Sequence, residues 1–175
     1  MNGGFGGSVL LSPTNLNLLC QHDMNRPVYE TDADRQREKE LAEQMAKHWG
    51  VTAKPNPKMY PIDYTFVGDY GEVEGFGEIK IRRNTKDKYP TYMISAHKVA
   101  EAKKLAEATG RDVILIVKWS CGSIGYLDLA NTPADSVHWG GRSDRGDGQD
   151  MEPVCHFNIE NFLSATKGEN DGERV

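Results

Sequence analysis

Two segments of the chain have apolar residues at helical spacing. The first predicted helix begins at Thr31 or Asp32, either of which can cap it, and ends before Gly50. Its apolar stripe is formed by Leu41, Ala42, Met45 and Trp49. At about 100° per residue Glu38 lies in line with this stripe, whereas Glu40 points away from it. The second predicted helix runs from Ser95, as N-cap, to Gly110, with a stripe formed by Val99, Ala102 and Ala106.

Alternating and continuous apolar runs predict the strands of a sheet. Residues 60–67 and 77–81 alternate, and the turn residues between them favour an antiparallel pair. On this parity Ile62, Tyr64 and Phe66 share one face of their strand. Residues 113–119 are continuously apolar, which is typical of a central strand, and residues 124–129 pair with it. The remaining predictions are a loop at 51–58, a polar loop at 131–153, and a last edge strand with a turn at 154–162.

Two acids and a lysine are predicted to meet on the antiparallel pair. Glu78 and Lys80 are two residues apart, so their side chains project to one face, with Ile79 and Ile81 on the other. Asp63 would meet Glu78 across the two strands. Two converging carboxylates suit Mg²⁺, which takes oxygen ligands. A lysine beside them can hold and polarise a water near a scissile phosphate.

The motif Pro61-Ile62-Asp63 followed by Glu78-Ile79-Lys80 resembles the signature of the PD-(D/E)-x-K nuclease superfamily. The resemblance covers roughly residues 30 to 130, with the order helix, strand pair, helix and apolar strand. It implies an α/β (α+β) fold with a restriction-endonuclease-like core, in which helices flank a mixed central sheet. Residues 38–41 and 117–119 are similar to the corresponding parts of archaeal-type Holliday-junction resolvases.

This resemblance implies a Mg²⁺-dependent nuclease that hydrolyses phosphodiester bonds in nucleic acid, with DNA as the expected substrate. Asp63 and Glu78 would bind the metal with the backbone carbonyl of Ile79, and Mn²⁺ would substitute for Mg²⁺. Lys80 would position the attacking water. In the superfamily a helix glutamate often points into the metal site, and Glu38 matches it, for a second metal or a metal-bound water. Two alternatives stay open: a solvated Glu38, and a catalytically inactive nucleic-acid-binding or scaffold protein of the same fold.

The net charge of −5 argues against a globally basic nucleic-acid-binding surface. Between Lys80 and Lys104, however, eight basic residues stand against two acids, which indicates a local basic face beside the predicted site. The candidate nucleic-acid contacts are Arg82, Arg83, Lys86, Lys88 and Lys98, with Arg142 and Arg145 in the predicted loop. An ordinary solvated surface is the alternative for these residues.

The 175 residues are enough for one domain with its own core. We predict a flexible N-terminal arm at 1–28, one nuclease-like domain at 29–165 and a C-terminal tail at 166–175. Three scattered cysteines, no secretory signal and no long apolar run indicate a cytoplasmic protein without a membrane partner. Its small size and lack of extra domains indicate a phage-like enzyme. A cutter of symmetric junctions would need a homodimer, and the sequence leaves this open.

Overall fold

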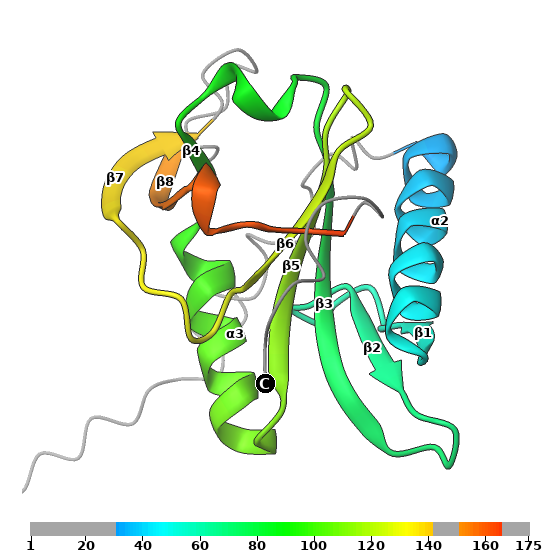
Figure 1. Cartoon of the computed structure of the whole chain (residues 1–175). Coiled ribbons are helices and arrows are strands. Elements are labelled where there is room, and N and C mark those ends of the chain that lie inside the picture. Colours follow the sequence, from blue (N-terminus) through cyan, green and yellow to red (C-terminus); the bar gives the residue numbers. More distant parts are fainter. Residues whose placement is uncertain (1–30, 142–150, 166–175) are drawn as a thin grey trace, which may run out of the picture. The chain divides into compact units, whose positions relative to one another are not determined.

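The computed structural model describes residues 31–141 and 151–165. Contacts divide the chain into two compact units, residues 1–31 and 32–175, and only Thr31 of the first unit is described. Within the described part of the second unit, the α-helices are α2 (Asp32–Trp49) and α3 (Ala96–Thr109) (Figure 1). No helix of the described residues is long and apolar enough to cross a membrane.

The larger of two sheets has the strand order β1-β2-β3-β5-β6-β9. Its strands are β1 (Thr52–Pro55), β2 (Tyr64–Val67), β3 (Val73–Ile81), β5 (Asp112–Lys118), β6 (Ile124–Asp128) and β9 (Leu163–Ser164). Strands β3 and β5 run parallel and the other neighbours are antiparallel. The predicted mixed central sheet is therefore confirmed.

A smaller antiparallel sheet has the order β4-β8-β7. Its strands are β4 (Thr91–Ser95), β8 (Met151–Asn158) and β7 (Ser136–Gly141), and short 3₁₀ helices cover Lys86–Lys88 and Ile159–Asn161. Because β8 lies between two other strands, it is not the edge strand that the sequence predicted. Strand β7 likewise occupies part of the predicted polar loop, and β1 occupies part of the predicted loop at 51–58.

Each face of the central sheet has its own apolar core, and the two helices lie on opposite faces (Figure 1). The helix α2 packs Leu41 and Met45 against Ile79 of β3. On the other face, α3 and the smaller sheet enclose Phe76 of β3 and Leu115 of β5. Since side chains alternate along a strand, Glu78 belongs to the α3 face of the sheet, opposite to α2.

The predicted limits of α3 are confirmed by its caps. The Ser95 hydroxyl accepts a hydrogen bond from the His97 N–H at 3.2 Å, and Gly110 ends the helix at a φ of 65°. Glycine is also needed where β2 and β3 approach closely: a Cβ on Gly77 would lie 2.7 Å from the Phe66 ring. This close approach helps to fix the register of the two strands.

One prediction about strand faces is wrong. Ile62 does not share a face with Tyr64 and Phe66, because it packs in the core on the α3 side, whereas they pack on the α2 side. The strand begins only at Tyr64, and the three residues before it form a bend, so strand parity does not extend back to them. This bend places Asp63 directly before the first paired residue of β2.

Candidate active site

The two acids of the motif meet where β2 begins. Tyr64 pairs with Gly77, which brings the preceding Asp63 beside Glu78. Glu78 is completely buried, whereas the side chain of Asp63 is 29% exposed. The backbone N–H of Ile79 donates a hydrogen bond to Asp63 Oδ2 at 2.9 Å, and this bond fixes the orientation of the carboxylate.

The ammonium of Lys80 lies among three oxygen atoms. Its Nζ is 2.7 Å from Glu78 Oε1, 2.8 Å from the carbonyl oxygen of Ile79 and 3.4 Å from Asp63 Oδ2. These are the three residues that the superfamily resemblance assigns as metal ligands. The oxygen atoms therefore converge on one point, which a cationic group fills in this structure.

A second lysine, Lys98 from the first turn of α3, approaches the same carboxylates from the other side. Its Nζ is 3.0 Å from Glu78 Oε2, 4.0 Å from Asp63 Oδ1 and 2.6 Å from the carbonyl oxygen of Pro61. The sequence suggested a phosphate contact for Lys98, and the structure gives it an ion pair inside the acid cluster. The only sequence signal for this placement was its position near the start of the helix.

The charges at the site determine the protonation of Lys80. Burial opposes its charged form, but the carboxylates of Glu78 and Asp63 outweigh burial and raise the pKa of Lys80 above its ordinary value. Lys80 is therefore a cation at neutral pH and does not act as a base in this arrangement. Its role must come from its charge and its hydrogen-bond donors.

The donor set fits a hard divalent cation. Glu78 Oε1 is buried and accepts no hydrogen bond within the described residues, although the Lys80 ammonium lies beside it. A buried carboxylate oxygen of this kind requires a positive partner. Two carboxylates and a backbone carbonyl are the oxygen ligands that Mg²⁺ accepts, with waters completing its coordination.

Glu38 does not lie with Asp63 and Glu78. It is half-buried on α2, which covers the face of the sheet opposite to Glu78. Among residues 31–141 and 151–165, no group of three or more Asp, Glu, His or Cys side chains could hold a metal ion. The structure thus brings together Asp63, Glu78 and Lys80, adds Lys98, and leaves Glu38 outside this cluster.

The other predicted nucleic-acid contacts differ in their exposure. Arg82 and Lys86 are half-buried, whereas Arg83 and Lys88 are exposed. His97, beside Lys98 in the sequence, is exposed as well. Arg142 and Arg145 lie outside the described residues.

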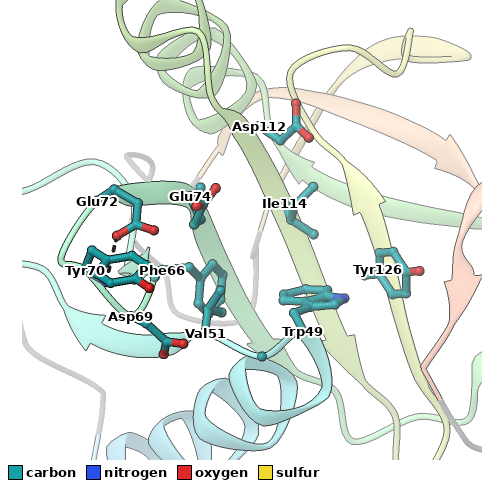
Figure 2. Close-up of a pocket in the computed structure, with 13 residues that line it drawn as sticks. Trp49, Val51, Phe66, Asp69, Tyr70, Glu72, Glu74, Asp112, Ile114 and Tyr126 are labelled. Carbon is teal, nitrogen blue, oxygen red and sulfur yellow. Dashed lines mark hydrogen bonds between the residues drawn. The ribbon is translucent and has the colours of Figure 1, made fainter.

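Two hollows in the described part of the chain have aromatic walls. We call the larger one, of about 560 Å³, the acidic hollow (Figure 2); it is lined by Trp49, Phe66, Tyr70, Tyr126, Asp69, Glu72, Glu74 and Asp112, among others. The smaller, of about 400 Å³, is the basic hollow; its lining includes Arg82, Lys86, Tyr89, Tyr92, Trp119 and His156. The acidic hollow contains none of the residues of the acid and lysine cluster.

A family described as "Phage putative PDDEXK endonuclease" matches residues 24–165. Since this match covers most of the chain, the chain belongs to that family, and the predicted membership of the PD-(D/E)-x-K nucleases is confirmed. The chain is also similar to the solved structure of Hjc, a Holliday junction resolvase from the archaeal hyperthermophile Archaeoglobus fulgidus. That similarity has 12% identity and a TM-score of 0.45, and covers 75% of this chain and 88% of the other. No curated protein matches the chain.

Proposed function

We propose that this chain is a DNA endonuclease that depends on a divalent metal, with Mg²⁺ as the metal and Mn²⁺ as a substitute. The observation that carries the proposal is the convergence of Asp63 Oδ2, Glu78 Oε1 and the Ile79 carbonyl on one cationic atom, Lys80 Nζ. Family membership supports the class of reaction, and the oxygen-rich donor set supports the choice of metal.

In this proposal Asp63, Glu78 and the Ile79 carbonyl hold the metal. When bound, the metal would polarise the scissile phosphate and lower the pKa of a water molecule. The Ile79 N–H keeps the Asp63 carboxylate in place through its hydrogen bond. Lys98 pairs with Glu78 and donates a hydrogen bond to the Pro61 carbonyl, so the bend before β2 and the middle of β3 stay together.

Lys80 has a separate role at the phosphate. Its ammonium can donate hydrogen bonds to a water and to a phosphate oxygen. A fixed positive charge beside the reacting phosphate stabilises the negative charge that develops in the transition state. Glu38 stays in the proposal only as a more distant acid that acts through water.

The substrate is placed by the basic residues around the end of β3. Arg82 and Lys86, with the exposed Arg83 and Lys88, follow Lys80 within eight residues, so they would contact the phosphate backbone beside the cut. Contacts of this kind add affinity that depends on salt but carry no sequence information. Arg142 and Arg145 are proposed as further contacts from sequence alone.

The experiment compares linear, nicked, single-stranded and four-way-junction DNA, each with Mg²⁺, with Mn²⁺ and with EDTA. We expect cleavage with either metal and none in EDTA. Lys80→Ala should lower kcat by about 10²- to 10³-fold, as loss of one transition-state donor does, while DNA affinity changes little. Lys103→Ala, at an exposed position on α3, is the matched control and should cleave normally.

Undiminished cleavage in EDTA would contradict the metal mechanism. If the wild type binds DNA but cuts none of these substrates with either metal, the chain is instead a nucleic-acid-binding or scaffold protein of the same fold. If Lys80→Ala loses DNA binding but keeps its turnover at saturating DNA, Lys80 is only a phosphate anchor.

A further inference from the structure

The basic hollow is built by three segments that lie apart in the sequence. The connection after β3 supplies Arg82, Lys86 and Tyr89, and β4 supplies Tyr92. The residue after β5, Trp119, and His156 of β8 complete the wall. Two backbone hydrogen bonds fasten the connection along the end of β5: the N–H of residue 82 donates to the carbonyl of residue 118 at 2.8 Å, and that of residue 120 donates to the carbonyl of residue 84 at 3.0 Å.

The chemistry of the hollow combines positive charge with aromatic rings. None of the described residues that line it is acidic. Arg82 Cζ lies 4.7 Å from the centroid of the Tyr92 ring, and Lys86 Nζ lies 5.7 Å from the centroid of Trp119. Proteins bind exposed nucleobases by stacking them on aromatic rings or guanidinium planes, and bind the attached phosphates with such cations.

Tyr92 connects this hollow to the acid and lysine cluster. Its side chain is almost fully buried, and its hydroxyl has no hydrogen-bond partner of good geometry within the described residues. Burial raises the pKa of Tyr92, and the charges of Arg82 and Lys80 partly offset this rise. The Tyr92 ring thus lies against Arg82 of the hollow, and the charge of Lys80 in the cluster acts on its hydroxyl.

The size of the hollow and its position next to Lys80 favour a single nucleotide as its ligand. A volume of about 400 Å³ lies in the range of small-molecule sites, which is about 300 to 1,000 Å³. Bases inside a duplex are stacked and paired, so they cannot place a ring face in such a site unless they leave the helix. Lys80 and Arg82 are two residues apart, which on an extended strand is about 6 to 7 Å. A nucleotide in the hollow would therefore be next to the phosphate at the cluster.

We propose that the basic hollow binds one unpaired nucleotide of the DNA strand beside the phosphate that is cut. The base lies against the exposed ring of Tyr89, and Arg82 and Lys86 hold its phosphate. This inference rests on the proposed nuclease function and narrows its substrate to DNA that carries unpaired nucleotides, such as a gap, a flap or a branch point. Uninterrupted duplex DNA is the weaker substrate.

The test measures the affinity of the full chain for two DNA molecules in EDTA, so that binding is observed without cleavage. One is a continuous duplex, and the other is the same duplex with a short single-stranded gap that contains 2-aminopurine. The variant is Tyr89→Ala, because Tyr89 is 53% exposed and its removal spares the core. Tyr70→Ala in the acidic hollow is the matched control, since Tyr70 is 97% exposed.

We expect the wild type to bind gapped DNA more tightly than duplex and to change the 2-aminopurine fluorescence. Tyr89→Ala should lose about 5- to 100-fold in affinity for gapped DNA, the range that a stacked base contributes, and should keep its duplex affinity. Tyr70→Ala should behave like the wild type. Equal wild-type affinity for the two DNA molecules, no binding to either, or gapped-DNA binding by Tyr89→Ala that matches Tyr70→Ala would each overturn the inference.

The same measurements distinguish a failure of the nucleotide site from a failure of the nuclease proposal. A protein that binds gapped DNA through Tyr89 but never cuts DNA would overturn the catalytic proposal and keep the nucleotide site. A protein that cuts duplex and gapped DNA equally, with no effect of Tyr89→Ala on affinity, would keep the nuclease and overturn the nucleotide site.

Discussion

The basic hollow and the acidic hollow have similar aromatic walls and opposite charge. Tyr89, Tyr92 and Trp119 line the first, and Trp49, Tyr70 and Tyr126 are among the rings of the second (Figure 2). Aromatic surface alone would therefore allow either hollow to bind a nucleobase. The difference lies in the ionised groups, because a phosphate backbone is attracted to one hollow and repelled by the other. The volume of a hollow would favour the wrong one as the DNA site, since the acidic hollow is the larger of the two.

The same contrast holds for the acids themselves. The acids of the acidic hollow are exposed, and Glu74 forms its ion pair with an exposed arginine, Arg111. Asp63 and Glu78 instead each lie beside two lysines. A carboxylate that is buried and paired can hold a cation at a defined point, and an exposed one is mainly solvated. Burial and pairing, more than the number of acids, distinguish the proposed catalytic cluster from the acidic hollow.

The largest difference in cleavage should come from replacing one acid of the cluster, Glu78, and comparing it with the replacement of one acid of the acidic hollow, Glu72. Glu78→Gln keeps the shape of the side chain but removes a metal ligand, so DNA cleavage should fall by orders of magnitude. Glu72→Gln in the acidic hollow should leave the cleavage rate unchanged. Single-turnover cleavage with Mg²⁺ measures both, and equal rates for the two variants would place the catalytic acids elsewhere.

Glu78→Gln should also lower the stability of the metal-free protein. Lys80 and Lys98, whose side chains are only 29% and 28% exposed, would lose their buried counter-charge. Leaving such charges unpaired costs free energy, typically about 3 to 5 kcal/mol when both partners are buried and less here. Thermal unfolding in EDTA measures the loss, and adding Lys98→Met should recover part of it.

An intermediate effect is expected from neutralising the basic hollow. Arg82→Gln combined with Lys86→Gln should make the slope of log K against log salt shallower by about 2, roughly one unit for each lost phosphate contact. Glu72→Gln combined with Glu74→Gln should leave this slope unchanged. DNA titrations at several salt concentrations give the slopes. An unchanged slope for the basic pair would place the DNA on another surface.

The smallest effect concerns the first helix. Because α2 covers the face of the sheet opposite to Glu78, Glu38→Ala should lower cleavage less than Glu78→Gln does, by about tenfold or less if it acts through one water-mediated contact. Glu40→Ala, on the exposed side of the helix, is the control and should have no effect. A loss of cleavage as large as that of Glu78→Gln would indicate that Glu38 binds the metal itself.

The sequence was sufficient for the parts of the site that one strand pair determines. The alternation along β3 placed Glu78 and Lys80 on one face, and the turn after β2 brought Asp63 opposite. Ile62 was misplaced because strand parity was extended into a bend that only the folded chain reveals. Lys98 was assigned to phosphate because its contact with Glu78 depends on how α3 returns over the sheet.

The parts that were missed depend on long-range pairing. The smaller sheet pairs β4 with β8, which are far apart in the sequence, and its strands carry little apolar alternation. The basic hollow likewise needs segments that lie apart in the sequence to meet, so Tyr89 had no recognisable role in the sequence. Arg82 and Lys86 were recognised as candidate nucleic-acid contacts, but the hollow that they line was not.

The central claim is that Asp63, Glu78 and the Ile79 carbonyl hold a metal at the point that the Lys80 ammonium fills in this structure. Crystals soaked in Mn²⁺ test it directly, because the anomalous signal locates the ion without any assumption about activity. We predict one peak within ligand distance of Asp63 Oδ2, Glu78 Oε1 and the Ile79 carbonyl oxygen, with Lys80 moved away from them. A peak beside Glu72 and Glu74 in the acidic hollow, with none at Asp63 and Glu78, would contradict the claim.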